Sequence, residues 1–291
     1  MHKAGFVNIV GNPNVGKSTL MNQLVGEKLS IATFKAQTTR HRIMGIVNTE
    51  DTQIVFSDTP GVLKPNYKMQ EMMLQFSESA LADADILLYV TDVVEDPEKN
   101  MDFLEKVSKM SIPVILLINK IDESDQKTLG NLVTKWHGLL PNAEILPISA
   151  KNKFGVDILL KRVHELLPES PAFFDKDQLT DKPAKFFVSE IIREKILRYY
   201  DKEIPYSVEV VIERFKEDDR QIHISAIIYV ERSSQKGIII GHQGMALKKV
   251  STEARKSLER FFDKKIFLET FVKVDKDWRN SQKELKHFGY S

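Results

Sequence analysis

The 291-residue sequence contains no cysteine. This absence excludes disulfide bonds and thiolate metal sites, and it fits a protein of the reducing cytosol. Long hydrophobic runs are missing too, since no stretch reaches the roughly 18 apolar residues that a membrane-spanning helix needs. The first residues lack the apolar segment and cleavage site of a secretory signal. We therefore expect a cytoplasmic protein.

A strong charge of one sign is also absent, because 42 Lys and Arg nearly balance 41 Asp and Glu. The distribution is uneven, however: the chain from Pro183 onward has 22 basic and 17 acidic residues. A basic half beside an acidic half favours a polyanionic partner for the C-terminal part, with ordinary drift in composition as the alternative.

Strand and helix patterns alternate in the first half. A chain of this length exceeds one ordinary hydrophobic core, so we expect two domains. Strands followed by helices predict an α/β domain with a doubly wound, mostly parallel sheet, whose ligands bind at the carboxyl ends of the strands. The predicted strands are 6–10, 52–57, 86–90, 114–118 and 145–148, and the predicted helices are 17–25, 69–82, 102–110, 129–139 and 156–166.

A charged stretch with three prolines ends this alternation after Leu167. We interpret residues 168–184 as a linker between a first domain, residues 1–167, and a second domain, residues 185–291. The element order of the second domain predicts a smaller α+β fold with helices on one face of a three-stranded sheet. The expected helices are 186–200, 246–262 and 278–287, and the expected strands are 206–215, 222–232 and 266–274.

A phosphate-loop motif, G-x-x-x-x-G-K-[ST], follows the first predicted strand and opens the first predicted helix. Its glycines let backbone N–H groups surround phosphate oxygens, and the helix N-terminus adds positive potential. Lys17 can reach the β- and γ-phosphates, while the Ser18 hydroxyl can bind Mg²⁺. The predicted phosphate-binding residues are Gly11, Asn12, Pro13, Asn14, Val15, Gly16, Lys17, Ser18 and Thr19.

A second motif, D-T-P-G at residues 58–61, follows the strand predicted at 52–57. Asp58 at this edge of the sheet can hold Mg²⁺, through water in our interpretation, and the Gly61 N–H can meet a γ-phosphate. In isolation D-x-x-G is an ordinary turn, and only its position after a phosphate loop favours the functional interpretation.

A third motif, N-K-I-D at residues 119–122, follows a strongly apolar strand. Asp122 can accept hydrogen bonds from the N1–H and 2-amino groups of guanine, both of which adenine lacks. We expect Asn119 to brace the loops, Lys120 to cover the base, and the Ala150 N–H to donate to guanine O6. The predicted guanine-binding residues are Asn119, Lys120, Asp122, Ser149 and Ala150.

In this order the motifs GNPNVGKS, QTTRH, DTPG, NKID and ISA resemble those of GTPases related to translation factors, and QTTRH resembles the switch segment of the Era family. The resemblance implies GTP or GDP and Mg²⁺ as ligands, with one switch threonine joining Ser18 and Asp58 at the Mg²⁺. We favour Thr39, with Thr38 as the alternative. The first switch comprises Gln37, Thr38, Thr39, Arg40 and His41, and the second Asp58, Thr59, Pro60 and Gly61.

The residue after the second switch motif departs from Ras-like enzymes, in which a glutamine orients the attacking water. Val62 cannot do this, because its side chain forms no hydrogen bonds. We expect slow hydrolysis of GTP, supported by Lys17, Thr39, Gly61 and Asn14. Asn14 resembles an asparagine that helps to place a monovalent cation in some related GTPases, so K⁺ dependence is a hypothesis for this chain.

A G-x-x-G motif lies between an apolar run and a long predicted helix in the second domain. Two glycines let the backbone approach a nucleic-acid backbone, and the order of elements resembles a type II KH domain. A glycine-rich helix entry is the alternative. The predicted RNA-binding residues are Ile238, Ile239, Ile240, Gly241, His242, Gln243, Gly244, Lys248, Lys249 and Arg255.

The Era family joins these two domains, so the resemblance covers essentially the whole chain. It implies a switch that binds the 3′ end of 16S ribosomal RNA, assists maturation of the 30S subunit and associates weakly with the inner face of the cell membrane. We expect a monomer and no DNA partner. Two alternatives remain: a P-loop kinase that prefers ATP, which Asp122 disfavours, and an RNA chaperone with a vestigial nucleotide site, which the intact motifs disfavour.

Overall fold

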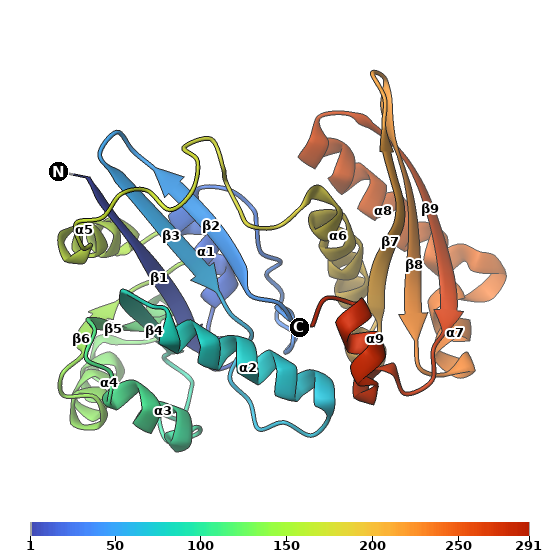
Figure 1. Cartoon of the computed structure of the whole chain (residues 1–291). Coiled ribbons are helices and arrows are strands. Elements are labelled where there is room, and N and C mark those ends of the chain that lie inside the picture. The colour runs from blue at the N-terminus through green and yellow to red at the C-terminus, as the bar shows by residue number, and fades with distance from the viewer. Residues whose placement is uncertain (1, 291) are drawn as a thin grey trace. The chain divides into compact units, whose positions relative to one another are not determined.

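The computed structural model describes residues 2–290, and these form two compact units. The first unit contains the chain up to Asn66 and Gln70–Asp181, and the second contains Tyr67–Met69 and the chain from Lys182 onward. Each unit has its own sheet (Figure 1). The expected pair of folds, α/β followed by a smaller α+β fold, is therefore confirmed, whereas the exact domain boundaries stay a prediction.

The first unit is built on a six-stranded sheet in the order β2-β3-β1-β4-β5-β6. All neighbouring strands are parallel except β2, which pairs antiparallel with β3. The central strands β3 and β4 are buried along their whole length, as expected for a sheet covered on both faces. The strands are β1 Lys3–Gly11, β2 Ile43–Asn48, β3 Thr52–Asp58, β4 Ile86–Asp92, β5 Val114–Asn119 and β6 Glu144–Pro147.

Five α-helices cover this sheet. One face packs against the apolar sides of α2, α3 and α4 through a cluster that includes Phe103, Val107 and Trp136. On the other face, α1 and α5 contact each other. The helices are α1 Lys17–Val25, α2 Lys68–Ala82, α3 Met101–Ser108, α4 Gln126–Leu139 and α5 Val156–Leu166, and a short 3₁₀ helix spans Ile121–Glu123. The five predicted helices are thus confirmed, with ends shifted by a few residues.

Strand β2, Ile43–Asn48, is absent from the sequence-based prediction, which was wrong to leave this stretch without structure. Its residues are all buried or partly buried, without regular alternation. It lies at the edge of the sheet and directly follows the first switch. Gly45 divides its apolar residues into two short pairs, so neither a longer apolar run nor a following helix marks it.

The segment after Leu167 follows the first unit rather than running freely. The Ile46 N–H donates to the Leu179 carbonyl at 2.8 Å, and Thr180 Oγ1 donates to the Met44 carbonyl at 2.6 Å. The Phe173 ring lies 4.8 Å from that of Phe6, measured between centroids. Residues up to Asp181 therefore belong to the first compact unit, although composition suggests a linker.

The second unit has a three-stranded sheet in the order β7-β8-β9. Strand β7 is antiparallel to β8, and β9 is parallel to it. The strands are β7 Glu209–Glu217, β8 Gln221–Val230 and β9 Lys265–Val274, and the helices are α6 Ala184–Tyr199, α7 Ser233–Ile240, α8 Met245–Phe262 and α9 Gln282–His287. Short 3₁₀ helices span Ile204–Tyr206, His242–Gly244 and Trp278–Asn280.

Two details of this unit correct the prediction. The apolar run before the G-x-x-G motif is the end of helix α7, which was not predicted as a helix. The last predicted helix, residues 278–287, is two shorter helices interrupted at Ser281. The Ser281 hydroxyl accepts the Glu284 N–H at 3.3 Å and so begins a new helix there.

The core of the second unit lies between the sheet and the helices α6, α7 and α8. Val188, Ile192 and Ile196 recur along one side of α6 and are fully buried. Trp278 is also fully buried, and its ring N–H donates to the Ser207 carbonyl at 3.2 Å. This tryptophan is therefore a core residue.

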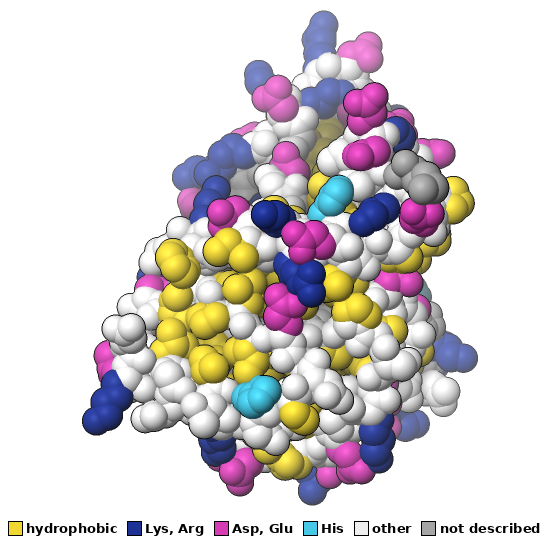
Figure 2. All heavy atoms as spheres, turned by 90° about the vertical axis from the view of Figure 1, so that its left-hand side faces the viewer, with side chains coloured by type: hydrophobic (Ala, Val, Ile, Leu, Met, Phe, Trp, Pro, Cys, Tyr) yellow, Lys and Arg dark blue, Asp and Glu magenta, His cyan; other side chains and the backbone are white. Residues whose placement is uncertain are grey.

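Some apolar side chains remain on the surface. Phe154 and Ile158, at the beginning of α5, are 61% and 55% exposed. On the face of the molecule that Figure 2 shows, hydrophobic side chains gather in two areas with charged side chains between them. Among the described residues, no helix is both long and apolar enough to cross a membrane.

Candidate nucleotide site and nucleic-acid surface

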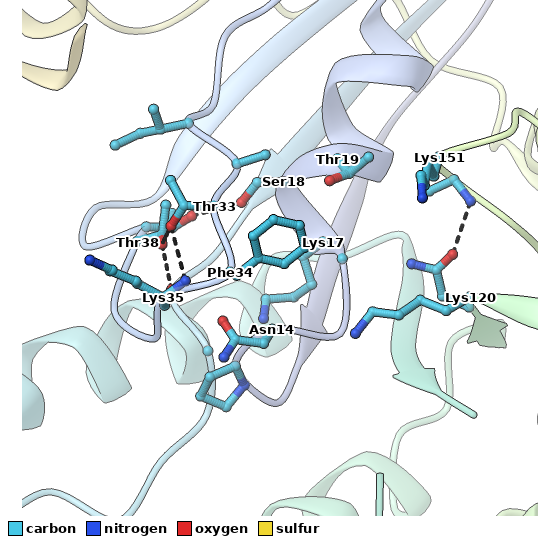
Figure 3. Close-up of a pocket in the computed structure, with 18 of the residues that line it drawn as sticks. Asn14, Lys17, Ser18, Thr19, Thr33, Phe34, Lys35, Thr38, Lys120 and Lys151 are labelled. Atoms are coloured by element: carbon cyan, nitrogen blue, oxygen red, sulfur yellow. Dashed lines mark hydrogen bonds between the residues drawn. The ribbon is translucent and has the colours of Figure 1, made fainter. Parts of the chain in front are cut away.

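A pocket of about 460 Å³ opens at the carboxyl ends of the parallel strands in the first unit. All five predicted motifs contribute residues to it, at the sheet edge where ligands of such sheets bind (Figure 3). The lining residues are Pro13, Asn14, Gly16, Lys17, Ser18, Thr19, Ile31, Ala32, Thr33, Phe34, Lys35, Gln37, Thr38, Thr39, Thr59, Gly61, Asn119, Lys120, Asp122, Glu123, Ala150 and Lys151. Gly11, Asn12 and Val15 of the phosphate loop lie behind this lining.

The two glycines of the phosphate loop are required by backbone geometry. Gly11 has φ +145°, and a Cβ there would lie 2.1 Å from the Val90 carbonyl oxygen. Gly16 has φ +98°, and its Cβ would lie 2.2 Å from the Asn119 side-chain nitrogen. A side chain at either position would displace the loop from β4 or from the N-K-I-D motif.

Lys17 is a buried cation at the centre of the pocket. Its Nζ donates to the Gly11 carbonyl at 3.0 Å and to the Asn12 carbonyl at 2.7 Å. Burial lowers the pKa of Lys17 to about 8, while the nearby Asp58 and Glu95 carboxylates act in the opposite direction. Both direct acceptors are neutral carbonyls, so the ammonium retains attraction for the phosphates of a nucleotide.

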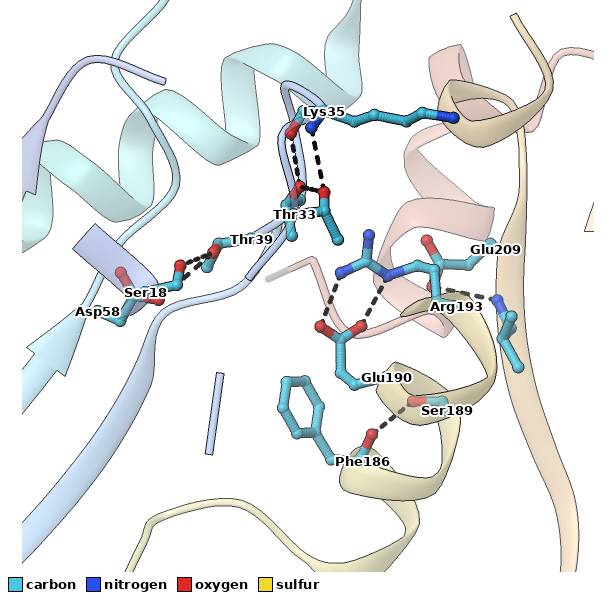
Figure 4. Close-up of polar contacts among 12 residues, drawn as sticks. Ser18, Thr33, Lys35, Thr39, Asp58, Phe186, Ser189, Glu190, Arg193 and Glu209 are labelled. Atoms are coloured by element: carbon cyan, nitrogen blue, oxygen red, sulfur yellow. Dashed lines mark hydrogen bonds and ion pairs between the residues drawn. The ribbon is translucent and has the colours of Figure 1, made fainter. Parts of the chain in front are cut away.

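Three hydroxyl and carboxylate groups from three separate segments converge beside Lys17 (Figure 4). Ser18 Oγ lies 2.8 Å from Thr39 Oγ1, which donates to Asp58 Oδ2 at 3.3 Å. Asp58 is fully buried, and its Oδ1 has no hydrogen-bond partner among the residues that the structure describes. Burial raises the pKa of its carboxyl group. An unpartnered buried carboxylate oxygen with two hydroxyls suits a hard cation such as Mg²⁺.

The structure distinguishes the two switch threonines. Thr38 Oγ1 donates to the Lys35 carbonyl at 2.6 Å and lies 2.7 Å from Thr33 Oγ1 (Figure 3). Only Thr39 stands beside Ser18, as the sequence analysis favours. Of the other predicted switch residues, Gln37 lines the pocket, Arg40 is buried, and the His41 ring lies 6.0 Å from that of Phe76.

The second switch is pressed against the phosphate loop. A Cβ on Gly61 would lie 2.6 Å from Pro13 Cα, so only glycine permits this approach. The Val62 N–H donates to the Gly11 carbonyl at 3.0 Å, and the Val62 side chain packs into the core at 4% exposure. Val62 therefore faces away from the pocket, and hydrolysis cannot use this position to orient water.

The N-K-I-D motif ties two loops together. Asn119 Nδ2 donates to the Val15 carbonyl at 2.8 Å, and the Ala150 N–H donates to Asn119 Oδ1 at 2.9 Å. The expected bracing role of Asn119 is thus seen directly. The Ala150 N–H is occupied by Asn119 here, so its contact with guanine O6 stays a prediction. Asp122 Oδ1 accepts the Ser149 hydroxyl at 2.6 Å, which orients its carboxylate at the pocket.

Three polar residues behind the pocket were missed by sequence reasoning. Asp92 pairs with Lys120 Nζ at 2.5 Å, and Glu95 accepts the Thr91 hydroxyl at 3.0 Å while burial raises the pKa of its carboxyl group. Asn100 contacts Asn12 of the phosphate loop. None belongs to a motif, and the only signal was that residues 92–100 follow a strand that ends at the ligand edge.

The G-x-x-G motif of the second unit has the backbone that its glycines allow. Gly241 has φ +70° and Gly244 has φ +74°, directly before helix α8. A Cβ on Gly241 would lie 2.6 Å from that of Ala246, whereas one on Gly244 would meet nothing within 4 Å. Gly241 is thus needed for packing, and Gly244 leaves the backbone open to a ligand.

The predicted RNA-binding residues divide by exposure. Ile238 is 49% exposed, but Ile239 is fully buried in the core, and its carbonyl accepts the Tyr200 hydroxyl at 2.7 Å. The prediction of a base contact for the Ile239 side chain is therefore wrong, because helix α7 turns it inward. Ile240 and Gly241 are partly buried, while His242, Gln243 and Lys248 are exposed.

The two other predicted RNA-binding cations, which also lie on α8, differ in their surroundings. Lys249 is exposed and its Nζ lies 4.5 Å from the Tyr199 ring centroid. Arg255 pairs with Glu259 at 2.6 Å on its own helix, which partly neutralises it. Lys248 and Lys249 are therefore the better placed of the three for a phosphate.

Comparisons with known proteins match a different family model to each of the two units. A family model described as 50S ribosome-binding GTPase matches residues 6–120, and a KH domain model matches residues 203–279. GTPase Era of Clostridium kluyveri is 44% identical over 100% of both chains, and GTPase Era of Geobacter sp. strain M21 is 46% identical over 99% of this chain and 98% of its own.

Solved structures of similar proteins cover the chain equally well. Era in complex with MgGDPNP and nucleotides 1506–1542 of 16S ribosomal RNA superposes with a TM-score of 0.95 at 37% identity and 100% coverage of both chains. A variant of Aquifex aeolicus Era bound to GDP·AlF4⁻ gives the same TM-score over 99% of each chain. By identity over its whole length and by its two matched domains, the chain belongs to the Era family of GTPases.

Proposed function

We propose that this chain binds and hydrolyses GTP with Mg²⁺ in its first unit and binds ribosomal RNA through its second. One observation carries the nucleotide part of the proposal. Ser18, Thr39 and Asp58 meet within hydrogen-bond distance although they come from three segments, and within residues 2–290 the buried Asp58 Oδ1 has no hydrogen-bond partner.

These three residues would hold the Mg²⁺, as the sequence predicts. When bound, Mg²⁺ neutralises negative charge on the β- and γ-phosphates during phosphoryl transfer. Lys17 would supply a second positive charge from within the phosphate loop, and the backbone N–H of Gly61, which lines the pocket, would bind the γ-phosphate. Both groups stabilise charge without having to move far, because the loop glycines fix their backbone.

Asp122 is the residue that would select guanine. Its Oδ1 is already held by Ser149, so the carboxylate is oriented before a base arrives. The Lys120 stem would cover the base while its ammonium pairs with Asp92. Adenine offers no donors to this carboxylate and would leave it unpaired, which favours GTP over ATP.

Hydrolysis would proceed without a glutamine at position 62. Asn14 lines the pocket with φ +67° and is exposed, so its side chain is available to a ligand or cation. A K⁺ ion placed by Asn14 would supply charge that Val62 cannot. Equal hydrolysis rates in K⁺ and Na⁺ buffers would eliminate this part of the proposal.

The RNA part of the proposal rests on the exposed G-x-x-G surface and on the similar Era structure that holds nucleotides 1506–1542 of 16S ribosomal RNA. We infer that the second unit of this chain binds the 3′ end of 16S ribosomal RNA. The open backbone at Gly244 and the neighbouring Lys248 and Lys249 would contact phosphates, while Ile238 would border unpaired bases. Binding at this end of the RNA would place the protein on the 30S subunit during maturation.

The cellular setting also remains a proposal. We place the protein in the cytoplasm as a monomer without a DNA partner, and we keep weak association with the inner membrane face as an expectation from the family. Co-sedimentation with vesicles containing anionic lipid would test that expectation directly, since a protein that stays in the supernatant contradicts it.

The decisive experiment measures hydrolysis and base selection together. Labelled GTP should be hydrolysed only when Mg²⁺ is present, and excess ATP should not compete. Asp58→Asn keeps the shape of the side chain but removes its charge, so hydrolysis should fall while the fold remains. If ATP displaces GTP, the chain is a kinase-like protein and the proposal is wrong.

A further inference from the structure

Helix α3 begins in an unusual way. Its N-cap is Asn100, a residue type that normally caps by accepting a backbone N–H of the first helical turn. Here the Asn100 side chain makes no such bond. Helix α3 therefore lacks the side-chain capping hydrogen bond that an asparagine at this position usually makes.

The Asn100 amide is used elsewhere. Its Nδ2 donates to Oδ1 of Asn12 and, at 3.2 Å, to the carbonyl of Val62. Asn12 is the second residue of the phosphate loop, and Val62 directly follows Gly61 of the second switch. One side chain thus connects the two segments that flank the γ-phosphate position of the pocket.

The acceptors of this bridge have little freedom. Asn12 and Val62 are 3% and 4% exposed, so a lost donor would leave a buried oxygen unpaired. Asn12 also hydrogen-bonds the carboxyl group of Glu95, which in turn accepts the Thr91 hydroxyl. The bridge is the end of a buried polar network that starts on strand β4.

We propose that Asn100 is a positioning residue for GTP hydrolysis, which holds the second switch at a fixed distance from the phosphate loop. The inference rests on the proposed hydrolysis of GTP in this pocket. Asn100 does not line the pocket, so it acts through Gly61, whose N–H must stay aligned with the γ-phosphate. Nucleotide binding depends mainly on Lys17 and Asp122 and should not need the bridge.

The substitution Asn100→Asp separates bridging from capping. A carboxylate has the same shape and is a good N-cap at a helix N-terminus, but it cannot donate to two oxygen acceptors. We expect kcat for GTP hydrolysis to fall about tenfold, as a misplaced catalytic group costs, while the Kd for GDP changes less than about twofold. The melting temperature should fall, because two buried acceptors lose their donor and the improved N-cap offsets only part of that loss.

A matched control removes a cap that forms no bridge. Asp125 caps helix α4 by accepting the Lys127 and Thr128 N–H groups, both at 2.9 Å, so Asp125→Ala should lower the melting temperature and leave kcat unchanged. Asn100→Ala should lower kcat as Asn100→Asp does. Wild-type kcat in Asn100→Asp, or a parallel loss of GDP binding, would overturn the inference. Absence of hydrolysis by the wild-type protein would instead refute the proposed function.

Discussion

The two candidate sites of this protein differ in where they keep their polar groups. In the nucleotide pocket Asp58 is fully buried and Lys17, Thr39 and Asn119 are at most 6% exposed. On the G-x-x-G surface His242, Gln243, Lys248 and Lys249 are all exposed. The part of the first site around Lys17 and Asp58 removes charges from water before its ligand arrives, and the second site leaves them solvated.

This difference explains why the two sites are specified so differently in sequence. A buried polar group must find a fixed partner, so each residue of the nucleotide site depends on others at set positions. Exposed lysines have water as an alternative partner, so their spacing is only loosely constrained. The comparison predicts large effects from single substitutions in the pocket and smaller, salt-dependent effects on the RNA surface.

The largest effect is expected from Lys17→Met, which keeps the apolar stem but removes the cation. Loss of a preorganised charge at the phosphates should reduce kcat/KM for GTP about 1000-fold. The melting temperature should not fall, because burial already disfavours the charged form of Lys17. Hydrolysis assays and calorimetry test both parts, and RNA binding without nucleotide serves as the control. Near wild-type hydrolysis by this variant would contradict the expectation that single substitutions in the pocket have large effects.

The next effect concerns base selection at Asp122. In Asp122→Asn the amide oxygen can still accept the Ser149 hydroxyl, but one acceptor becomes a donor. Affinity for GDP should fall about 100-fold, and affinity for the xanthine nucleotide should rise. Competition between labelled GDP and XDP measures the change. If guanine preference persists, Asp122 does not read the base.

A smaller effect is expected on the RNA surface from Gly244→Asp. Space is available, and both Asp and Asn tolerate the φ of +74° at this position. The added negative charge should weaken binding of a 16S 3′-end RNA about tenfold, with a reduced dependence on salt. Gly244→Asn, which is uncharged and of equal size, should bind RNA more tightly than Gly244→Asp. Equal binding by both variants would argue against phosphate contact here.

The mildest test is pH. The pKa of Lys17 is lowered to about 8, so the nucleotide-free protein loses this cation as pH rises above that value, and bound phosphates would retain it. The Kd for GDP should therefore rise by up to about tenfold per pH unit above the pKa. In the unfolded chain Lys17 keeps its proton to higher pH, so the cost of burying the charge is full below about pH 8 and declines above it. Lys17→Met should show a flat binding profile in the same range.

The sequence predicts most of the pocket because its residues come in ordered motifs. Phosphate loop, switches and guanine-reading segment all lie where the motifs place them, and the geometry even separates Thr39 from Thr38. Asp92, Glu95 and Asn100 could not be predicted, since their contacts depend on how the loop after β4 folds back. Ile239 was misassigned because three consecutive isoleucines on a helix cannot all face the same side.

The fold, too, could be predicted only where side-chain patterns indicate it. Buried parallel strands are recognised as apolar runs, and amphipathic helices by the spacing of their apolar residues. Strand β2 lacks both signals, since Gly45 divides its apolar residues and no helix follows it. It is held in place by backbone hydrogen bonds to β3 and to Leu179. An edge strand of this kind is defined by backbone pairing with distant parts of the chain rather than by its side-chain pattern.

The segment that follows Leu167 has a practical consequence for dividing the protein. It pairs with the outer side of β2 and covers Phe6 with Phe173, so it shields a sheet edge that would otherwise offer unpaired N–H and C=O groups to other chains. A fragment cut at Leu167 would expose that edge and tend to aggregate. A fragment that continues through Asp181 would keep the edge closed and should remain monodisperse.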